Sequence, residues 1–91
     1  MSANTEQILF SGQVQGVGFR WTTERIAAGL PVNGFVRNLR DGRVEVIVSG
    51  TPDSVQRLID GLYMEYGGGI SAVERRTIEV PGHFTGFVIR R

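Results

Sequence analysis

The stretch VNGFVRNLRDGRVEVIVS, residues 32–49, predicts a pair of antiparallel strands joined by a tight turn. Valine stands at every second position between residues 43 and 49, which predicts a strand with one buried face. Asp41-Gly42 predicts the turn, because glycine accepts the positive φ that tight hairpins require. Residues 32–39 supply the partner strand, and this hairpin is the centre from which we predict the rest of the fold.

The segment before the hairpin predicts one strand and one helix. Residues 7–12 form the strand, with Ile8 and Phe10 on one face and Leu9 on the other. A helix is predicted over residues 19–28, because apolar and small side chains recur there at helical spacing. Its expected buried stripe consists of Phe19, Thr23, Ile26, Ala27 and Leu30. Gly29 and Pro31 then supply the signals that end this helix.

The segment after the hairpin predicts a second helix and two more strands. Thr51 can cap this helix, and Pro52 fits its first turn. Apolar side chains follow at i, i+3, i+4 and i+7 and give its buried face: Val55, Leu58, Ile59 and Leu62. The remaining predicted elements are a glycine break at residues 67–69, a strand over 72–80, a turn at Pro81-Gly82 and a short strand over 84–89.

This order of elements predicts an α+β fold. Strand, helix, strand, strand, helix, strand is the split βαβ (ferredoxin-like) plan, βαββαβ, here with a short extra C-terminal strand. We expect two helices packed on one face of a mostly antiparallel sheet. The chain has 91 residues, which is enough for one core, so a single domain is predicted over residues 1–91.

Composition excludes several classes of chemistry. The chain has no Cys, which rules out disulfides, thiolate nucleophiles and thiolate metal sites. All ten basic residues are Arg, which removes Schiff-base catalysis and the lysine of the Walker A motif. The single histidine, His83, cannot by itself build a His-rich zinc site.

The charge and the hydropathy pattern limit the partners that we expect. Ten basic and nine acidic residues give a net charge of +1, so no large basic field exists to attract nucleic acid or anionic lipid. No apolar run approaches the ~18 to 20 residues that a membrane span requires. Residues 1–7 are polar and carry no basic cluster, so they resemble neither a signal nor a transit peptide. We therefore expect a cytoplasmic protein with no membrane partner.

The loop between the first strand and the first helix, Gln15-Gly16-Val17-Gly18-Phe19-Arg20, is the candidate site. Its two glycines let the backbone approach a ligand and turn successive N–H groups toward it. The following helix adds free N–H groups and the positive end of its dipole, and Arg20 adds a guanidinium. These groups together suit a small dianion. A glycine loop that merely turns the chain is the alternative, because two glycines alone are weak evidence.

Asn38, near the end of the second strand, is the second candidate residue. Alternation places Asn38 on the same face as Val36, and it places Phe35 and Arg37 on the other. At a strand end, the Asn38 side chain can reach toward a neighbouring loop. By itself, an Asn before a turn is more typical of a turn residue.

At these two places the sequence resembles the acylphosphatase family. Residues 12–20, GQVQGVGFR, meet every fixed position of a signature of the form aliphatic-x-Gly-x-Val-Gln-Gly-Val-x-Phe-Arg, with Phe10 at the aliphatic position. The second signature, Gly-aromatic-Val-basic-Asn followed by Gly-x-Val and Gly, is met by residues 34–50. The ending GFVIR resembles the last strand of the family. Departures occur at Gln13, at Pro31 and in the 67–69 glycines, and none of them falls on Arg20 or Asn38.

The resemblance implies hydrolysis of acyl phosphates to a carboxylate and inorganic phosphate, without a metal or another cofactor. Backbone N–H groups of Gln15, Gly16, Val17, Gly18 and Phe19 are then expected to hold the phosphoryl oxygens. Arg20 would neutralise their charge, and Asn38 would hold the attacking water in line. The expected partners are a small acyl phosphate and inorganic phosphate as product and inhibitor, bound by a monomer that binds no nucleic acid.

Two rival functions remain open at this point. RNA-recognition domains share the split βαβ plan, although the stacking aromatic pattern is incomplete here. A phosphate-binding relative without turnover would keep the loop and lack the chemistry. Salt-sensitive RNA binding would favour the first rival, and phosphate binding without hydrolysis would favour the second.

The other polar and aromatic residues are interpreted more simply. His83 and Asp41 are expected in turns, Trp21 as a packing residue and Arg37 as a solvated side chain. The carboxylates show no pairing suggestive of acid–base catalysis: Glu45, Asp53 and Asp60.

Overall fold

Two α-helices and five strands make up the part of the chain that the computed structural model describes, residues 4–80 and 82–91. The strands are β1 (Asn4–Gly12), β2 (Asn33–Asn38), β3 (Val44–Gly50), β4 (Ile70–Ile78) and β5 (Phe87–Arg90). The helices are α1 (Phe19–Ala28) and α2 (Pro52–Tyr66), and a short 3-10 turn, η1 (Gly67–Gly69), follows α2. The predicted bounds of the first helix are confirmed.

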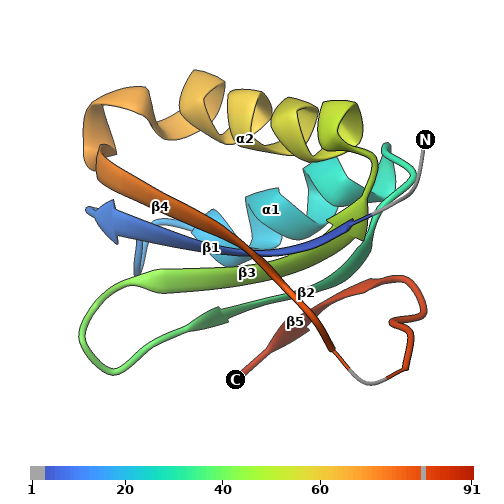
Figure 1. The fold of residues 1–91 in the computed structure, drawn as a ribbon. Helices are drawn as coiled ribbons and strands as arrows, with labels where there is room; N and C mark the ends of the chain where they lie inside the picture. Colours follow the sequence, from blue (N-terminus) through green and yellow to red (C-terminus); the bar gives the residue numbers. More distant parts are fainter. Residues whose placement is uncertain (1–3, 81) are drawn as a thin grey trace.

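The strands form one sheet in the order β4-β1-β3-β2-β5. All neighbouring pairs are antiparallel except β2 and β5, which run parallel. Both helices cover the same face of the sheet (Figure 1). The α+β, ferredoxin-like prediction is therefore confirmed, including the extra strand at the C-terminal end. Because β2 and β5 are parallel, their carboxyl ends meet at one edge of the sheet.

The core lies between the helices and the covered face of the sheet. Valines 44, 46 and 48 are completely buried there, as the alternation in β3 predicts. In α1, Thr22 is buried in addition to the expected stripe, whereas Ile26 and Leu30 are only partly buried. The whole buried apolar cluster consists of Ile8, Phe10, Val14, Phe19, Ala27, Val32, Val36, Val44, Val46, Val48, Val55, Leu58, Ile59, Leu62 and Ile70.

The bounds of three strands differ from the prediction. β1 begins at Asn4, three residues early, because its first residues pair with the end of β3. β4 begins at Ile70, directly after the glycine turn, and ends before Val80. β5 begins only at Phe87. Of the predicted turn at 81–82, Pro81 lies outside the described residues.

Strand β3 is buried on both faces because it lies at the centre of the sheet. On the face away from the helices, Glu45 is only 5% exposed and accepts hydrogen bonds from the side chains of Gln7 and Arg37. The side chain of Arg37 is 45% exposed, as the interpretation of a solvated residue expects. It lies on the face opposite Asn38, as predicted, but an ion pair with Glu45 across the β2–β3 register holds it.

Only glycine fits at position 34 in β2. Its φ is 146°, and a Cβ atom there would lie 1.8 Å from the carbonyl oxygen of Ile47 in the neighbouring strand. The central pairing of β2 with β3 therefore has no room for any side chain at this position. Gly42 in the hairpin turn also has a positive φ, 97°, but a Cβ there would meet nothing within 4 Å.

We predict that Gly34→Ala destabilises the fold by more than about 2 kcal/mol, because backbone strain and overpacking add. Gly42→Ala is the matched control, since it introduces strain without a clash and should lose only about 1 kcal/mol. Urea unfolding of the two variants measures the difference. If both variants lost the same free energy of unfolding, the close approach of β2 and β3 at Gly34 would not exclude a side chain.

Candidate functional site

A small pocket lies where the glycine loop, the start of α1 and the ends of β2 and β5 meet. Its volume is about 200 Å³. It is lined by Val14, Gly16, Gly18, Phe19, Arg20, Trp21, Asn38 and Ile89. Both candidate catalytic residues, Arg20 and Asn38, therefore line the same pocket. Gln15 and Val17 belong to the same loop but do not line this pocket.

The loop curves around the pocket because two of its residues adopt left-handed backbone conformations. Gly16 has φ 77° and Gly18 has φ 78°. A Cβ at Gly16 would meet nothing within 4 Å, so conformation rather than space requires glycine there. Residues other than glycine rarely adopt such φ values, and the alternating geometry turns backbone N–H groups into a concavity that suits an anion.

Helix α1 begins at the pocket without a side-chain cap. Gly18 occupies the N-cap position, and the first helical hydrogen bond joins the N–H of Thr22 to the carbonyl oxygen of Gly18 at 2.9 Å. The N–H groups of Phe19, Arg20 and Trp21 therefore have no partner within the helix. Together with the helix dipole, they favour a negative charge in front of the helix.

The side chain of Gln15 fastens the loop to the β2–β3 turn. Its Nε2 donates to the carbonyl oxygens of Leu39 at 2.8 Å and Arg43 at 2.9 Å. These two carbonyls lie just beyond Asn38, so the amide of Gln15 sets the spacing between the loop and the end of β2. The sequence analysis considered only the backbone of Gln15 and did not anticipate this side-chain role.

Tyr66, at the end of α2, fastens the middle of the loop. Its hydroxyl donates to the carbonyl oxygen of Val17 at 3.0 Å and lies 2.9 Å from the hydroxyl of Thr22. Its ring also packs on Phe19, with centroids 5.1 Å apart. In a trans peptide the C=O and N–H groups point in opposite directions. Holding the Val17 carbonyl at Tyr66 therefore turns the N–H of Gly18 away from α2, on the side where Gly18 lines the pocket.

Arg20 is the one arginine on the wall of this pocket. Its Nη1 donates to the carbonyl oxygen of Arg90 at 3.5 Å, which draws the side chain along β5. Within residues 4–80 and 82–91, no carboxylate forms an ion pair with Arg20. Its guanidinium therefore keeps most of its donors for a ligand.

Asn38 carries a buried acceptor with no partner. Its Oδ1 is inaccessible and is the only such unsatisfied side-chain atom found among the described residues. Leaving a buried polar atom unpaired disfavours the fold by about 1–3 kcal/mol. Asn38 lines the pocket, so a small rotation of its side chain would bring this acceptor to a water or a ligand hydrogen in the pocket.

The nearby hairpin turn supplies no acid. Arg43 donates to Asp41 through its Nε at 2.9 Å and through its backbone N–H at 3.0 Å. The side-chain hydrogen bond from Arg43 is the main reason that the pKa of Asp41 lies below its usual value. Asp41 is therefore ionised near neutral pH and has no proton to donate.

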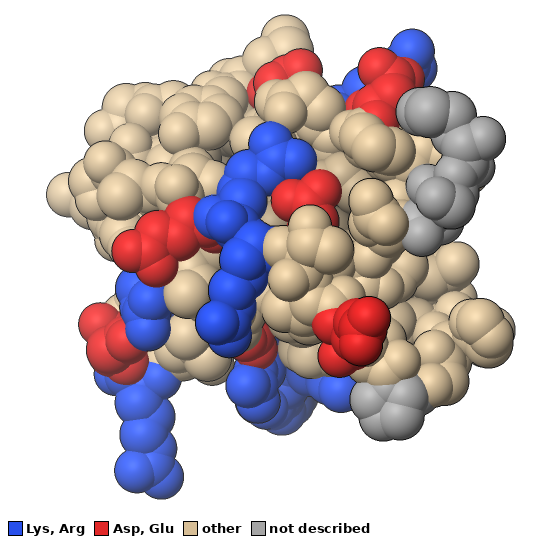
Figure 2. Space-filling view, viewed as in Figure 1, with Lys and Arg blue, Asp and Glu red and all other residues tan. Residues whose placement is uncertain are grey.

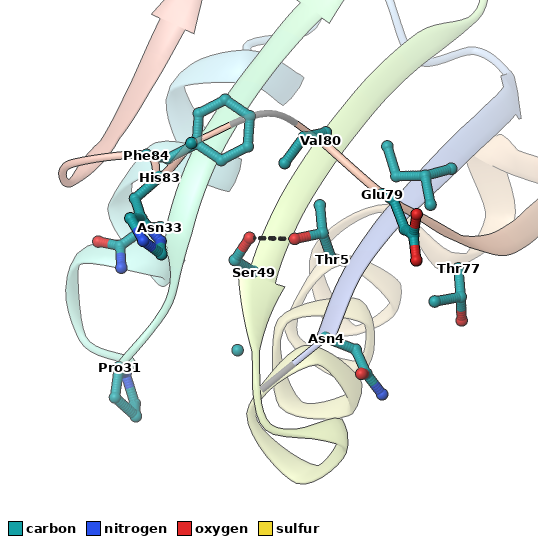
Figure 3. A pocket seen from close by; sticks show the side chains of 13 residues that line it. Asn4, Thr5, Pro31, Asn33, Ser49, Thr77, Glu79, Val80, His83 and Phe84 are labelled. Carbon is teal, nitrogen blue, oxygen red and sulfur yellow. Dashed lines mark hydrogen bonds between the residues drawn. The ribbon is translucent and has the colours of Figure 1, made fainter. Parts of the chain in front are cut away.

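A larger hollow of about 870 Å³ lies at the opposite end of β2 (Figure 3). Asn33, at the start of β2, lines it together with His83 and Glu79. No arginine belongs to its lining, so it suits an anion less well than the pocket at Arg20. His83 therefore lies near the opposite end of β2 from Asn38. It belongs to a segment without regular secondary structure, which agrees with its predicted place in a turn.

Trp21 differs from its predicted role. Its side chain is 61% exposed, so it is not a packing residue of the core. It lies on the outer side of α1, where it lines the pocket beside Arg20. The helical stripe identifies the buried residues of α1 but does not reveal this contact, because Trp21 lies outside the stripe.

The described part of the chain shows neither a metal-binding cluster nor a membrane-spanning helix. No group of three or more His, Cys, Asp or Glu side chains lies close enough together to hold a metal ion among residues 4–80 and 82–91. In the same residues, no helix combines the length and the apolar composition that crossing a membrane requires.

Comparison with known proteins relates the chain to a single family. The family model described as Acylphosphatase matches residues 6–89. A protein named Acylphosphatase from Yersinia pseudotuberculosis is 45% identical over 82 residues, 87% of each chain. Another of that name, from Thermococcus kodakarensis, is 42% identical over 80 residues, 86% of each chain. The structure of an acylphosphatase from Coxiella burnetii matches with a TM-score of 0.82 at 31% identity and covers 98% of this chain and 94% of that chain.

We predict that Tyr66→Phe weakens the binding of inorganic phosphate about 2- to 10-fold. The variant keeps the ring on Phe19 and loses the hydrogen bond to Val17, which corresponds to about 0.5–1.5 kcal/mol. Isothermal titration with phosphate measures the change. Tyr63→Phe, on the same helix and 43% exposed, is the control and should bind like the parent. If Tyr66→Phe bound phosphate as tightly as the parent protein, the hydroxyl of Tyr66 would not be needed to shape the loop.

Proposed function

The chain belongs to the acylphosphatase family and hydrolyses acyl phosphates, and from this premise we propose that Arg20 and Asn38 carry the reaction. The phosphoryl group is held by the backbone N–H groups of residues 15–19 and by the start of α1. The observation that carries the proposal is that Asn38 and Arg20 line one pocket, and that among the described residues Oδ1 of Asn38 has no hydrogen-bond partner and Arg20 has no carboxylate partner.

Arg20 binds and stabilises the phosphoryl oxygens. Its planar guanidinium can donate two parallel hydrogen bonds to two of these oxygens. Phosphoryl transfer demands mainly positioning and charge stabilisation from a protein. A fixed cation beside preorganised N–H groups supplies both, because the loop and helix do not have to rearrange as charge moves onto the phosphoryl oxygens.

Asn38 positions the attacking water. After a small rotation of the side chain exposes Oδ1 to the pocket, this atom accepts a hydrogen bond from the water, whose lone pair is then directed at phosphorus, opposite the bond to the acyl oxygen. The new bond forms between the water oxygen and phosphorus. The bond between phosphorus and the acyl oxygen breaks, and the carboxylate leaves with the electron pair. A proton of the water passes to a phosphoryl oxygen, so the products are a carboxylate and inorganic phosphate.

The chemistry of the leaving group explains why no protein base is needed. A carboxylate is stable without protonation, so no acid has to assist its departure. Asn is not a base near neutral pH, and the nearby Asp41 is held in an ion pair with Arg43. Alkyl phosphates lack such a leaving group and should be poor substrates.

The surface and the family match favour hydrolysis over the two rival functions. On the face drawn in Figure 2, basic side chains form a narrow stripe with acidic side chains beside it. Three of the arginines form ion pairs, Arg37 with Glu45, Arg43 with Asp41 and Arg75 with Glu6, which leaves less free positive charge for RNA. Inorganic phosphate should act as a competitive inhibitor, because it is a product that fits the same loop. The monomeric state, the cytoplasmic location and the single domain over residues 1–91 stay predictions.

We predict that Arg20→Lys lowers kcat/KM for an acyl phosphate by about 100-fold or more and weakens inhibition by phosphate. Lysine keeps the charge but cannot reproduce the paired donors of the guanidinium. Phosphate release from a synthetic acyl phosphate, measured with and without a chelator, checks both the residue and the independence from metal. Arg57→Lys, on α2 and paired only with Asp53, is the control. Full activity of Arg20→Lys would contradict the proposed role.

We predict that Asn38→Ala lowers kcat about 100-fold and leaves the inhibition constant of phosphate within about twofold of the parent. The variant removes the acceptor that holds the water, whereas the loop and Arg20 are intact. Steady-state kinetics with phosphate as inhibitor separates the two effects. The control is Asn33→Ala at the other end of β2, which loses a hydrogen bond to Gly86 and should change stability more than kcat. A parental kcat in Asn38→Ala would disprove the water-positioning role.

A further inference from the structure

The residues assigned so far hold the phosphoryl half of the substrate and leave the acyl half unplaced. Two more residues that line the same pocket have apolar and accessible side chains: Trp21, 61% exposed, and Ile89, 36% exposed. We call these two residues the apolar wall. Trp21 comes from α1 and Ile89 from β5, so the apolar wall faces the pocket from the elements that also position Arg20.

Exposure alone does not make an apolar side chain functional. Met64 on α2 is 88% exposed and lines none of the three pockets described in this chain, which is ordinary for a surface residue. Trp21 differs because its exposed indole adjoins the guanidinium and the carboxamide that the reaction requires. A bound acyl group would cover apolar area there that the free protein leaves in water.

The indole of Trp21 is held from one side. The guanidinium of Arg25, one helical turn further along α1, lies 5.5 Å from the centre of the indole. Arg25 is itself fixed by an ion pair with Glu65 of α2, with Nη2 and Oε1 2.9 Å apart. A cation over one face of the ring and a carboxylate behind that cation restrict the orientations of the indole. A side chain that is already restricted loses less freedom when a ligand covers it.

We propose that the apolar wall is the acyl subsite, and that the preferred substrates are acyl phosphates with a flat or branched apolar group next to the carboxyl carbon. This proposal rests on the proposed function, since it places the acyl group of the substrate hydrolysed at Arg20 and Asn38. Among the described residues, Arg20 is the only charged one that lines the pocket, and the phosphoryl group occupies it. The pocket therefore offers an aromatic surface, rather than a second charge, to the acyl half.

The kinetic test compares benzoyl phosphate with acetyl phosphate, which share the phosphoryl group and differ in the acyl group. In Trp21→Ala, KM for benzoyl phosphate should rise about tenfold more than KM for acetyl phosphate. Trp21→Phe should restore most of the difference, because it keeps an aromatic surface. Met64→Ala is the control and should change neither KM. Equal changes for the two substrates in Trp21→Ala would overturn the acyl subsite.

A binding test that needs no turnover separates this proposal from the proposed function. Trp21 is the only tryptophan of the chain, so its fluorescence reports directly on the apolar wall. Phenacylphosphonate carries a phenyl ketone on a phosphonate that cannot be hydrolysed, and acetonylphosphonate is its methyl counterpart. Phenacylphosphonate should change the fluorescence more and bind more tightly than acetonylphosphonate, and Ile89→Ala should reduce the difference.

The possible failures are distinguishable. If the parent protein hydrolyses neither acyl phosphate, the proposed function fails, whatever the fluorescence shows. If it hydrolyses both, but the two phosphonates bind equally and change the fluorescence equally, the acyl subsite is wrong and the roles of Arg20 and Asn38 stand.

Discussion

The site depends on the fixing of one loop, residues 13–18, in a conformation that leaves its backbone donors free for a ligand. Gln13 donates its N–H to the glycine turn after α2, at 2.7 Å from the carbonyl oxygen of Gly69. Gln15 ties the loop to the β2–β3 turn, and Tyr66 holds the carbonyl of Val17. The three anchors come from two separate parts of the chain, the β2–β3 turn and the end of α2 with the glycine turn that follows it. A loop held in this way presents its amides without the entropic penalty that a mobile loop would meet on binding.

The same region concentrates groups that the fold leaves unsatisfied. Helix α2 begins with a full cap, in which the hydroxyl of Thr51 accepts from the N–H of Ser54 at 3.2 Å. Helix α1 has no side-chain cap, Arg20 has no carboxylate partner among the described residues, and Oδ1 of Asn38 has no partner. Each of these groups would be more stable if it were paired within the protein. Their convergence on one pocket is what a binding site requires, and stability is supplied by the core elsewhere.

Local pattern was sufficient to predict most of the fold, and the resemblance to a known family was needed to assign roles to Arg20 and Asn38. The hairpin, the helix over 19–28 and the capped start of α2 follow from turn chemistry, periodicity and a capping residue, each of which acts within a few positions. The loop was identified by its glycines, and Asn38 by its place near a strand end. The early start of β4 and the late start of β5 were missed, because strand bounds depend on which partner strand lies alongside.

The sequence by itself determined the α+β order of elements and the position of the glycine loop between the first strand and the first helix, because these follow from preferences of short segments. Only the tertiary structure decided that β5 lies parallel to β2, that Arg37 pairs with Glu45, and that Trp21 is exposed beside the site. It also joined Tyr66 to Val17, which are 49 residues apart. Such contacts form between segments that no local rule connects, because the packing of the whole chain, rather than the preference of any residue, selects the neighbours of a side chain.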